Sequence, residues 1–182
     1  MPTNQSINFA IDPTTNQPWA SPQSIPNDRW VNRGLTLNND TSRASTQDCR
    51  LAKQQIIRFS NGAPTPTNPA AGSGVTLGTS LPTQQNSCSS IPIRMSFIQP
   101  MSALRVDFTG LPDVAYTAVF EFQDGTTNQV VVNGPAKIAD TASAALKAPD
   151  PKNMITAVTF GHQPGQTDSF RNATFIRSVG YT

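Results

Sequence analysis

Apolar and polar residues alternate along most of this chain, and a period of two is typical of half-buried β-strands. The alternation begins at Ile7, Phe9 and Ile11. It recurs in longer runs in the second half of the chain, and shorter apolar runs indicate further strands. The alternating runs cover 91–97, 104–108, 118–122, 130–132 and 156–160, and the other predicted strands cover 34–37, 54–59 and 175–181.

Two local signals add a turn and a helix to this pattern. Asp124 and Gly125 separate two of the predicted strands, and an Asp-Gly pair is a strong signal for a hairpin turn. The segment 140–146 is rich in alanine, and Asp140 or Thr141 stands where an N-cap is needed. The sequence therefore predicts one short helix at 140–146.

Two stretches are predicted to be irregular. Four prolines between 12 and 33 remove backbone donors and fix φ, so this segment is predicted to be an extended arm pinned to the domain by Trp19 and Trp30. The segment 61–74 has the Pro, Gly and Ala content of an excursion loop. It is not a domain boundary, because the sequence before it holds too few apolar residues for a core of its own.

The order of elements predicts the fold class. Roughly eight to ten short strands with turns between them indicate an all-β fold, a two-sheet antiparallel β-sandwich of the jelly-roll type. The length of 182 residues fits a single domain, 1–182, that carries the arm, the loop and at most one short helix.

Composition and charge limit the classes of partner that this chain is expected to bind. The chain has 13 Lys and Arg against 11 Asp and Glu, a formal charge of +2, and its basic residues are scattered singly, so no nucleic-acid partner is expected. No apolar run approaches the ~18 residues that span a bilayer, so no membrane partner is expected. The N-terminal residues form neither the basic nor the apolar region of an export signal, which favours a protein that is not secreted.

Acid–base chemistry has few candidates. His162 is the only histidine and Glu121 the only glutamate. His162 stands in a Gly, Pro and Gln loop and is predicted to be a solvated turn residue. Asp107 and Glu121 each alternate with buried positions and are expected to face solvent, although two such carboxylates on one sheet face would suit a glycosidase. No catalytic residue, cofactor site or metal site is predicted, and the protein is not expected to be an enzyme.

Cys49 and Cys88 are the only cysteines, too few sulfur ligands for a structural zinc site. They form either one disulfide, which closes a long loop across 61–74, or two free thiols. Spacing alone does not decide between these states, because it does not place the two Cα atoms within reach of each other.

The order of motifs resembles a bacterial jelly-roll domain of secreted, surface-sorted proteins that is similar in shape to carbohydrate-binding modules. The resemblance rests on Ile7 and Phe9, an Asn-to-Trp step at 27–30 and the Gly-Leu-Thr-Leu run at 34–37. It continues in IRMSFIQPMSALRVDFTG, in AYTAVFEFQDG and in the closing ITAVTFG and FIRSVGYT. The resemblance implies the sandwich fold and no particular activity.

The same resemblance suggests a calcium site, but the residues of this chain depart from its pattern. Relatives end in an acidic-Asn-aromatic strand that helps to hold a structural calcium ion, which Asp12 would complete. Here Arg177 and Ser178 stand at those positions, so calcium is not expected, because Ca²⁺ needs several converging oxygen ligands.

Two functions fit these observations. The first is a structural protein of a virus particle, a decoration or cement protein of a tailed bacteriophage whose arms wrap major capsid proteins or copies of itself in the virion. The second is a secreted or cell-surface module that binds polysaccharide, with Trp19 and Trp30, joined by Tyr116 and Tyr181, as a stacking platform. The sequence favours the first, and the second remains open.

Overall fold

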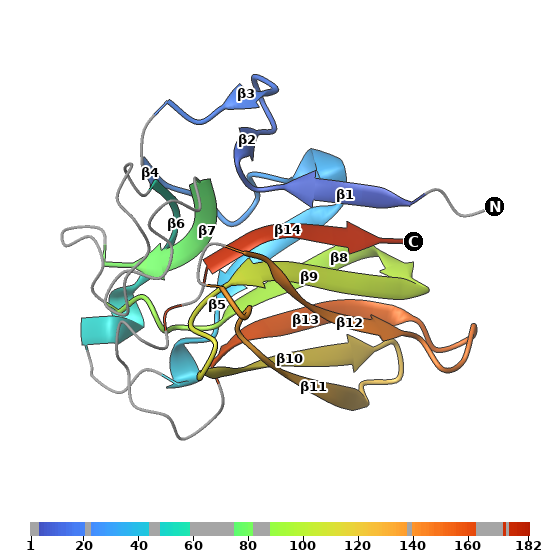
Figure 1. Cartoon of the computed structure of the whole chain (residues 1–182). Coiled ribbons are helices and arrows are strands. Elements are labelled where there is room, and N and C mark those ends of the chain that lie inside the picture. Colours follow the sequence, from blue (N-terminus) through green and yellow to red (C-terminus); the bar gives the residue numbers. More distant parts are fainter. Residues whose placement is uncertain are drawn as a thin grey trace.

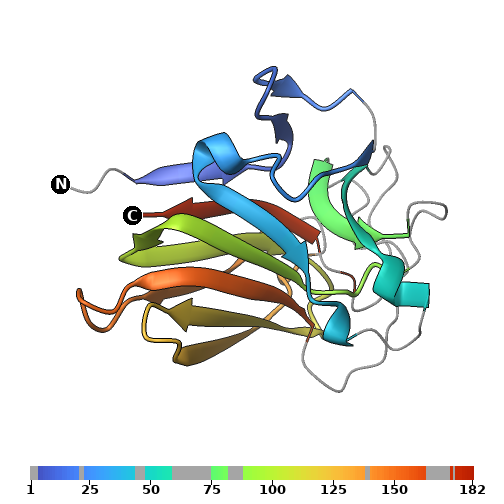
Figure 2. The same ribbon diagram turned by 180° about the vertical axis from the view of Figure 1, so that it is seen from behind.

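The computed structural model describes residues 4–20, 23–43, 48–58, 75–81, 88–137, 140–162, 173 and 175–182. The predicted loop at 61–74 and most of the segment after His162 lie outside these residues. Two antiparallel sheets form the body of the protein, and the seven-stranded sheet faces the viewer in Figure 1 while the five-stranded sheet faces the viewer in Figure 2. The predicted two-sheet antiparallel β-sandwich is confirmed.

Strands from distant parts of the described chain alternate within each sheet. The seven-stranded sheet runs β12 (Ala142–Lys147), β9 (Ala103–Thr109), β14 (Phe175–Tyr181), β7 (Val75–Ser80), β6 (Lys53–Arg58) and β4 (Gln23–Ser24), with β1 (Gln5–Asn8) also paired to β14. The five-stranded sheet runs β11 (Thr127–Asn133), β10 (Ala115–Phe122), β13 (Ile155–His162), β8 (Ile93–Met101) and β5 (Leu35–Asn39). A small ribbon of β2 (Ile11–Asp12) and β3 (Gln17–Pro18) and three 3₁₀ turns, η1 (Val31–Arg33), η2 (Thr41–Arg43) and η3 (Asp48–Leu51), complete the order.

Aromatic rings join the two sheets across the core. Phe108 of the seven-stranded sheet lies 4.6 Å from Phe160 and 4.9 Å from Tyr116 of the five-stranded sheet, measured between ring centroids. All three side chains are fully buried, and their tilted contacts add to the free energy gained from apolar burial. The inward-facing residues of each sheet thus form one side of a hydrophobic core that the two sheets share.

The N-terminal segment folds back onto its own domain. Trp30 is 1% exposed and packs edge-on against Phe9 at 5.1 Å, and Trp19 meets Trp30 at 6.1 Å. The Trp19 indole Nε1 also donates a hydrogen bond of 2.9 Å to the Phe9 carbonyl. The described residues of the segment 12–33 are therefore held on the sandwich, and they include short strands.

The helix expected at 140–146 is wrong, because β12 occupies this segment as an edge strand. It pairs antiparallel with β9 from Ala142 opposite Phe108 to Lys147 opposite Ala103. Helix propensity, which is highest for alanine, is a weak preference that tertiary pairing overrides. Pairing with β9 satisfies backbone groups of that strand and buries Ala144 completely.

The predicted hairpin turn is confirmed, and some strands were not predicted. The Asp124 and Gly125 turn joins β10 to β11 as a hairpin, and Gly125 adopts φ +81°, a region that favours glycine. Besides the short strands β3 and β4 in the N-terminal segment, the strand β7 escaped prediction, and it pairs with β6 over its whole length. Its mixture of Thr, Gly and Ser hides the alternation, since its polar residues Thr76, Thr79 and Ser80 are buried too.

Replacement of the arm's central anchor tests this packing. Trp30→Ala is expected to lower the free energy of unfolding by about 3–5 kcal/mol, because it leaves a large cavity among buried rings. Val31→Ala is the matched control, since Val31 is 40% exposed and its truncation is expected to cost less than about 0.5 kcal/mol. Urea unfolding followed by tryptophan fluorescence, with circular dichroism as a second signal, measures both. Equal effects of the two variants would contradict the buried position of Trp30.

Candidate functional site

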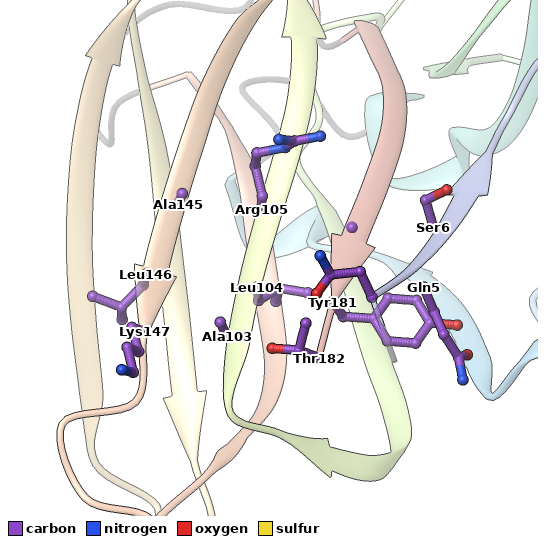
Figure 3. A pocket seen from close by; sticks show the side chains of 12 residues that line it. Gln5, Ser6, Ala103, Leu104, Arg105, Ala145, Leu146, Lys147, Tyr181 and Thr182 are labelled. Atoms are coloured by element: carbon purple, nitrogen blue, oxygen red, sulfur yellow. The ribbon is translucent and has the colours of Figure 1, made fainter. Parts of the chain in front are cut away.

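A groove of about 460 Å³ crosses one end of the seven-stranded sheet. Figure 3 shows that its lining residues come from four neighbouring strands, β12, β9, β14 and β1. The sheet register places Ser6 opposite Gly180, Gly180 opposite Arg105 and Arg105 opposite Ala145. This row alternates with the buried Leu104 and Tyr181, so it lies on the outward face of the sheet.

Small residues form the floor of the groove. Gly180, Ala103 and Ala145 line it on three adjacent strands. A Cβ atom added at Gly180 would lie 3.8 Å from the Gln5 carbonyl oxygen and 3.9 Å from Arg105 Nη2. Glycine within a strand often marks a place where another group approaches the backbone closely. The absence of a side chain at Gly180 leaves the centre of the groove open.

Polar side chains surround this floor. Asn4 and Ser6 stand on the β1 side, Lys147 on the β12 side and Arg105 in between. Figure 3 shows Arg105 extending from β9 toward β14, and Lys147 at the other margin of the groove. The groove thus combines hydroxyl, amide, guanidinium and ammonium groups with a small apolar floor, a mixture that suits a polar ligand with apolar C–H patches.

Asp107 holds the guanidinium of Arg105, which lines the groove. Its carboxylate accepts hydrogen bonds from Ser143 Oγ at 2.6 Å and Ser178 Oγ at 2.8 Å, and it pairs with Arg105 Nε at 3.0 Å. The expectation that Asp107 faces solvent freely is wrong, because this residue is only 9% exposed. The network fixes the guanidinium from one side and leaves its Nη groups toward the groove.

The predicted stacking platform is not present in the structure. Trp19 and Trp30 are 3% and 1% exposed, Tyr116 is fully buried, and the Tyr181 hydroxyl donates a hydrogen bond of 3.1 Å to the Arg33 carbonyl. Both tryptophans instead act as anchors of the N-terminal segment, as the sequence predicted. Among the described residues, every aromatic side chain belongs to the buried class.

The candidate acid–base residues do not converge. Asp107 lies in the seven-stranded sheet and Glu121 in the five-stranded sheet, where Arg94 binds it with both Nε and Nη2, at 2.9 and 2.7 Å. The Arg94 hydrogen bond holds the pKa of Glu121 below its ordinary value, against the opposing effect of burial. His162, predicted to be a solvated turn residue, is instead the last residue of β13 and is 2% exposed. It stands opposite the buried Tyr116 of β10.

Arg29 provides the positive charge at Asp12. Its Nη2 donates to both Asp12 oxygens, at 2.7 and 2.8 Å, and its guanidinium lies 5.3 Å from the centre of the Trp19 ring. No group of three or more His, Cys, Asp or Glu side chains gathers for a metal within the described ranges. Asp12, which the family resemblance suggested as a calcium ligand, thus forms an internal ion pair with Arg29.

Cys49 and Cys88 form a disulfide, with Cα atoms 5.3 Å apart. The bond ties η3 to the segment that leads into β8, and Cys49 packs with Ala52 and Ile91 in a small second core. Thr79 on β7 supports it by donating to the carbonyls of Cys88 and Ile91. The fold brings together two cysteines that lie 39 positions apart.

No described helix is long and apolar enough to cross a membrane. No family model matches the chain, and no curated protein matches it. Solved structures with a similar shape do exist.

An exo-β-1,3-galactanase from Phanerochaete chrysosporium, solved with galactose, has a TM-score of 0.42 and 11% identity over 90% of this chain and 30% of that chain. TmCBM61, solved with β-1,4-galactotriose, has a TM-score of 0.39 and 11% identity over 88% of this chain and 98% of that chain. A mutant of a carbohydrate binding module family 29 has a TM-score of 0.36 and 7% identity over 98% and 92%. This chain spans less than a third of the galactanase's length.

The expectation of a phage decoration protein is wrong. The described part of the segment 12–33, expected to wrap neighbouring shell subunits, is instead packed on its own domain through Trp19 and Trp30.

The groove residues were missed at the level of sequence. Arg105, Lys147 and Gly180 stand on strands far apart in the chain, and none of them belongs to a local motif. The one local signal is a small residue two positions from a basic one, Ala103 before Arg105 and Ala145 before Lys147. Only the order β12-β9-β14 makes these pairs adjacent.

Removal of the disulfide is expected to destabilise the protein. For a closed loop of this length the chain-entropy estimate is a loss of about 3–4 kcal/mol in the Cys49→Ser/Cys88→Ser double variant. Denaturant unfolding with and without a reductant measures it, and the double variant serves as control because a reductant should not affect it. An unchanged unfolding midpoint of the wild-type chain on reduction would contradict this expectation.

The Asp12 and Arg29 pair is expected to make stability depend on pH. Burial raises the pKa of Asp12, but hydrogen bonds from the Thr14 backbone N–H and from Arg29 outweigh it and hold that pKa below its ordinary value. Because the folded pKa is the lower one, the stabilisation is present at neutral pH and is lost as pH falls through the folded pKa.

Asp12→Asn is therefore expected to cost about 1.5–3 kcal/mol at pH 7 and progressively less below about pH 4. Unfolding titrations of both proteins from about pH 7 to about pH 2.5 test this, since that range spans the ordinary carboxyl pKa. A constant difference between the two proteins over that range would refute the assignment.

Proposed function

We propose that this protein binds carbohydrate, without cleaving it, through the groove on the outer face of the seven-stranded sheet. The observation that carries the proposal is the row Ser6, Gly180, Arg105 and Ala145, which sets hydrogen-bonding groups around an open, apolar floor. A sugar ring presents hydroxyl groups at its edge and C–H groups on its face, and this row offers partners for both. The groove's volume lies within the range of about 300–1,000 Å³ seen for ligand sites.

Binding without cleavage fits the positions of the carboxylates. A glycosidase needs two carboxyl groups across one bond, about 5–10 Å apart. The groove lining includes no Asp or Glu among the described residues, and the nearby Asp107 carboxylate is held by two serines and by Arg105. Glu121 lies in the other sheet and is paired with Arg94.

The disulfide bears on where the protein acts. A disulfide between Cys49 and Cys88 persists in oxidising surroundings, which supports a role outside the cell or at its surface. Polysaccharide is the partner expected there.

Filling the floor of the groove tests the function. Gly180→Val places a branched side chain where ligand would lie, and the neighbouring Gln5 and Arg105 atoms leave ordinary contact distances for its Cβ. Affinity for the polysaccharide that the wild type retains is expected to fall by roughly tenfold or more, about 1.4 kcal/mol. Affinity gel electrophoresis against a panel of neutral and acidic polysaccharides measures this.

The control for this variant is Gln129→Val, an exposed strand position on the five-stranded sheet. It makes a comparable change away from the groove and should leave binding unaltered, while both variants keep the wild-type unfolding midpoint. If the wild type binds no polysaccharide in the panel, or if Gly180→Val binds as well as the control, the proposal fails.

A further inference from the structure

The charged side chains that line the groove are all positive among the described residues. Arg105 and Lys147 are among its lining residues, which include no acidic side chain in the part of the chain that the structure describes. Lys147 has no ion-pair partner in the described chain, and Arg105 has only Asp107, which lies beyond the lining. An apolar floor beside two cations lowers the local screening of charge, so a negatively charged ligand is favoured there over a neutral one.

The Arg105 guanidinium is presented in a fixed orientation. Asp107 engages Nε at 3.0 Å, and the two serine hydroxyls hold the carboxylate in turn. Nη2 then lies 3.9 Å from the position of a Cβ on Gly180, above the floor of the groove. Arg105 remains 57% exposed in its side chain, so its outer edge is available to a planar carboxylate, which matches the guanidinium fork.

Lys147 lies at a different point of the groove. It stands opposite Ala103, whereas Arg105 stands opposite Ala145, so the two cations are diagonal neighbours on adjacent strands. Cα atoms in that relation are about 7–8 Å apart, and Figure 3 shows the two side chains extending in different directions. Two separated positive charges suit a chain with repeated carboxylates better than one isolated anion.

From these observations we infer that the groove selects acidic glycan chains, in which uronic acid carboxylates pair with Arg105 and Lys147. The inference rests on the proposed function and specifies its ligand class. Aromatic stacking contributes little, since the aromatic rings of the described residues are buried, and charge-assisted hydrogen bonds replace it as the source of selectivity.

Polygalacturonate and its methyl-esterified form are the test pair, because they share a backbone and differ in charge. The wild type is expected to bind polygalacturonate roughly tenfold more tightly at low salt, and this preference should shrink as salt screens it. Arg105→Gln is expected to lose roughly tenfold in affinity for polygalacturonate, the usual effect of one charge-assisted contact, and Lys147→Gln several-fold. Isothermal titration calorimetry at two salt concentrations measures each constant.

Lys53→Gln is the matched control, since Lys53 is an exposed lysine on the same sheet outside the groove. It removes the same charge and should bind like the wild type. Dextran sulfate is the second comparison, and equal affinity for it would mean general attraction of polyanions and overturn the assignment of carboxylate.

The outcomes separate the two proposals. Equal, groove-dependent binding of both forms of the polymer would overturn the selection of acidic glycans and leave carbohydrate binding standing. An effect of Lys53→Gln as large as that of Arg105→Gln would overturn the assigned contacts. No binding of any polysaccharide would overturn the proposed function itself.

Discussion

Burial of aromatic rings between the two sheets is the constraint from which the rest of this structure follows. Phe108 meets Phe160 and Tyr116 across the sandwich, and Trp30 and Phe9 close it on the side of the N-terminal segment. Because strand residues alternate in direction, each ring that points inward commits its neighbours to the outer face. The outward row Ser6, Gly180, Arg105 and Ala145 of the seven-stranded sheet is thereby left to small, hydroxyl and charged side chains.

That division explains the character of the groove. Leu104 and Val106 are buried, so Arg105 between them lies on the outer face. In the same way, Gly180 lies on the outer face between the buried Val179 and Tyr181. An aromatic residue in the outward row would give a stacking surface, but the aromatic side chains of the described chain are used in the interior. Under the proposed function, recognition at this face depends on hydrogen bonds and charge.

Two local devices hold the less regular part of the chain on the sandwich. The pairing of Asp12 with Arg29, under the Trp19 ring, fixes the start of the N-terminal segment. The disulfide between Cys49 and Cys88 fixes the region around β6 and β7, whose buried side chains are partly polar. Both devices compensate for stretches that lack a continuous apolar face.

Periodicity alone was enough to predict the all-β class, the sandwich and most strands of its second half, because a two-residue alternation is a local property of the chain. The Asp124 and Gly125 hairpin was predictable for the same reason. The segment 140–146 was not predicted correctly, since pairing with β9 overrides local helix propensity even where alanine makes it highest. The buried state of His162 and Asp107 escaped prediction because it depends on neighbours from other strands.

The candidate site belongs almost entirely to the tertiary structure. Ser6, Arg105, Ala145 and Gly180 come from the two ends and the middle of the sequence, and the order β12-β9-β14 with β1 beside it makes them one row. The two-residue alternation in the sequence determined only that alternate residues of a strand lie on its outer face. Strand register decided which of those side chains meet, because register is set by the packing of the whole core and not by any local segment.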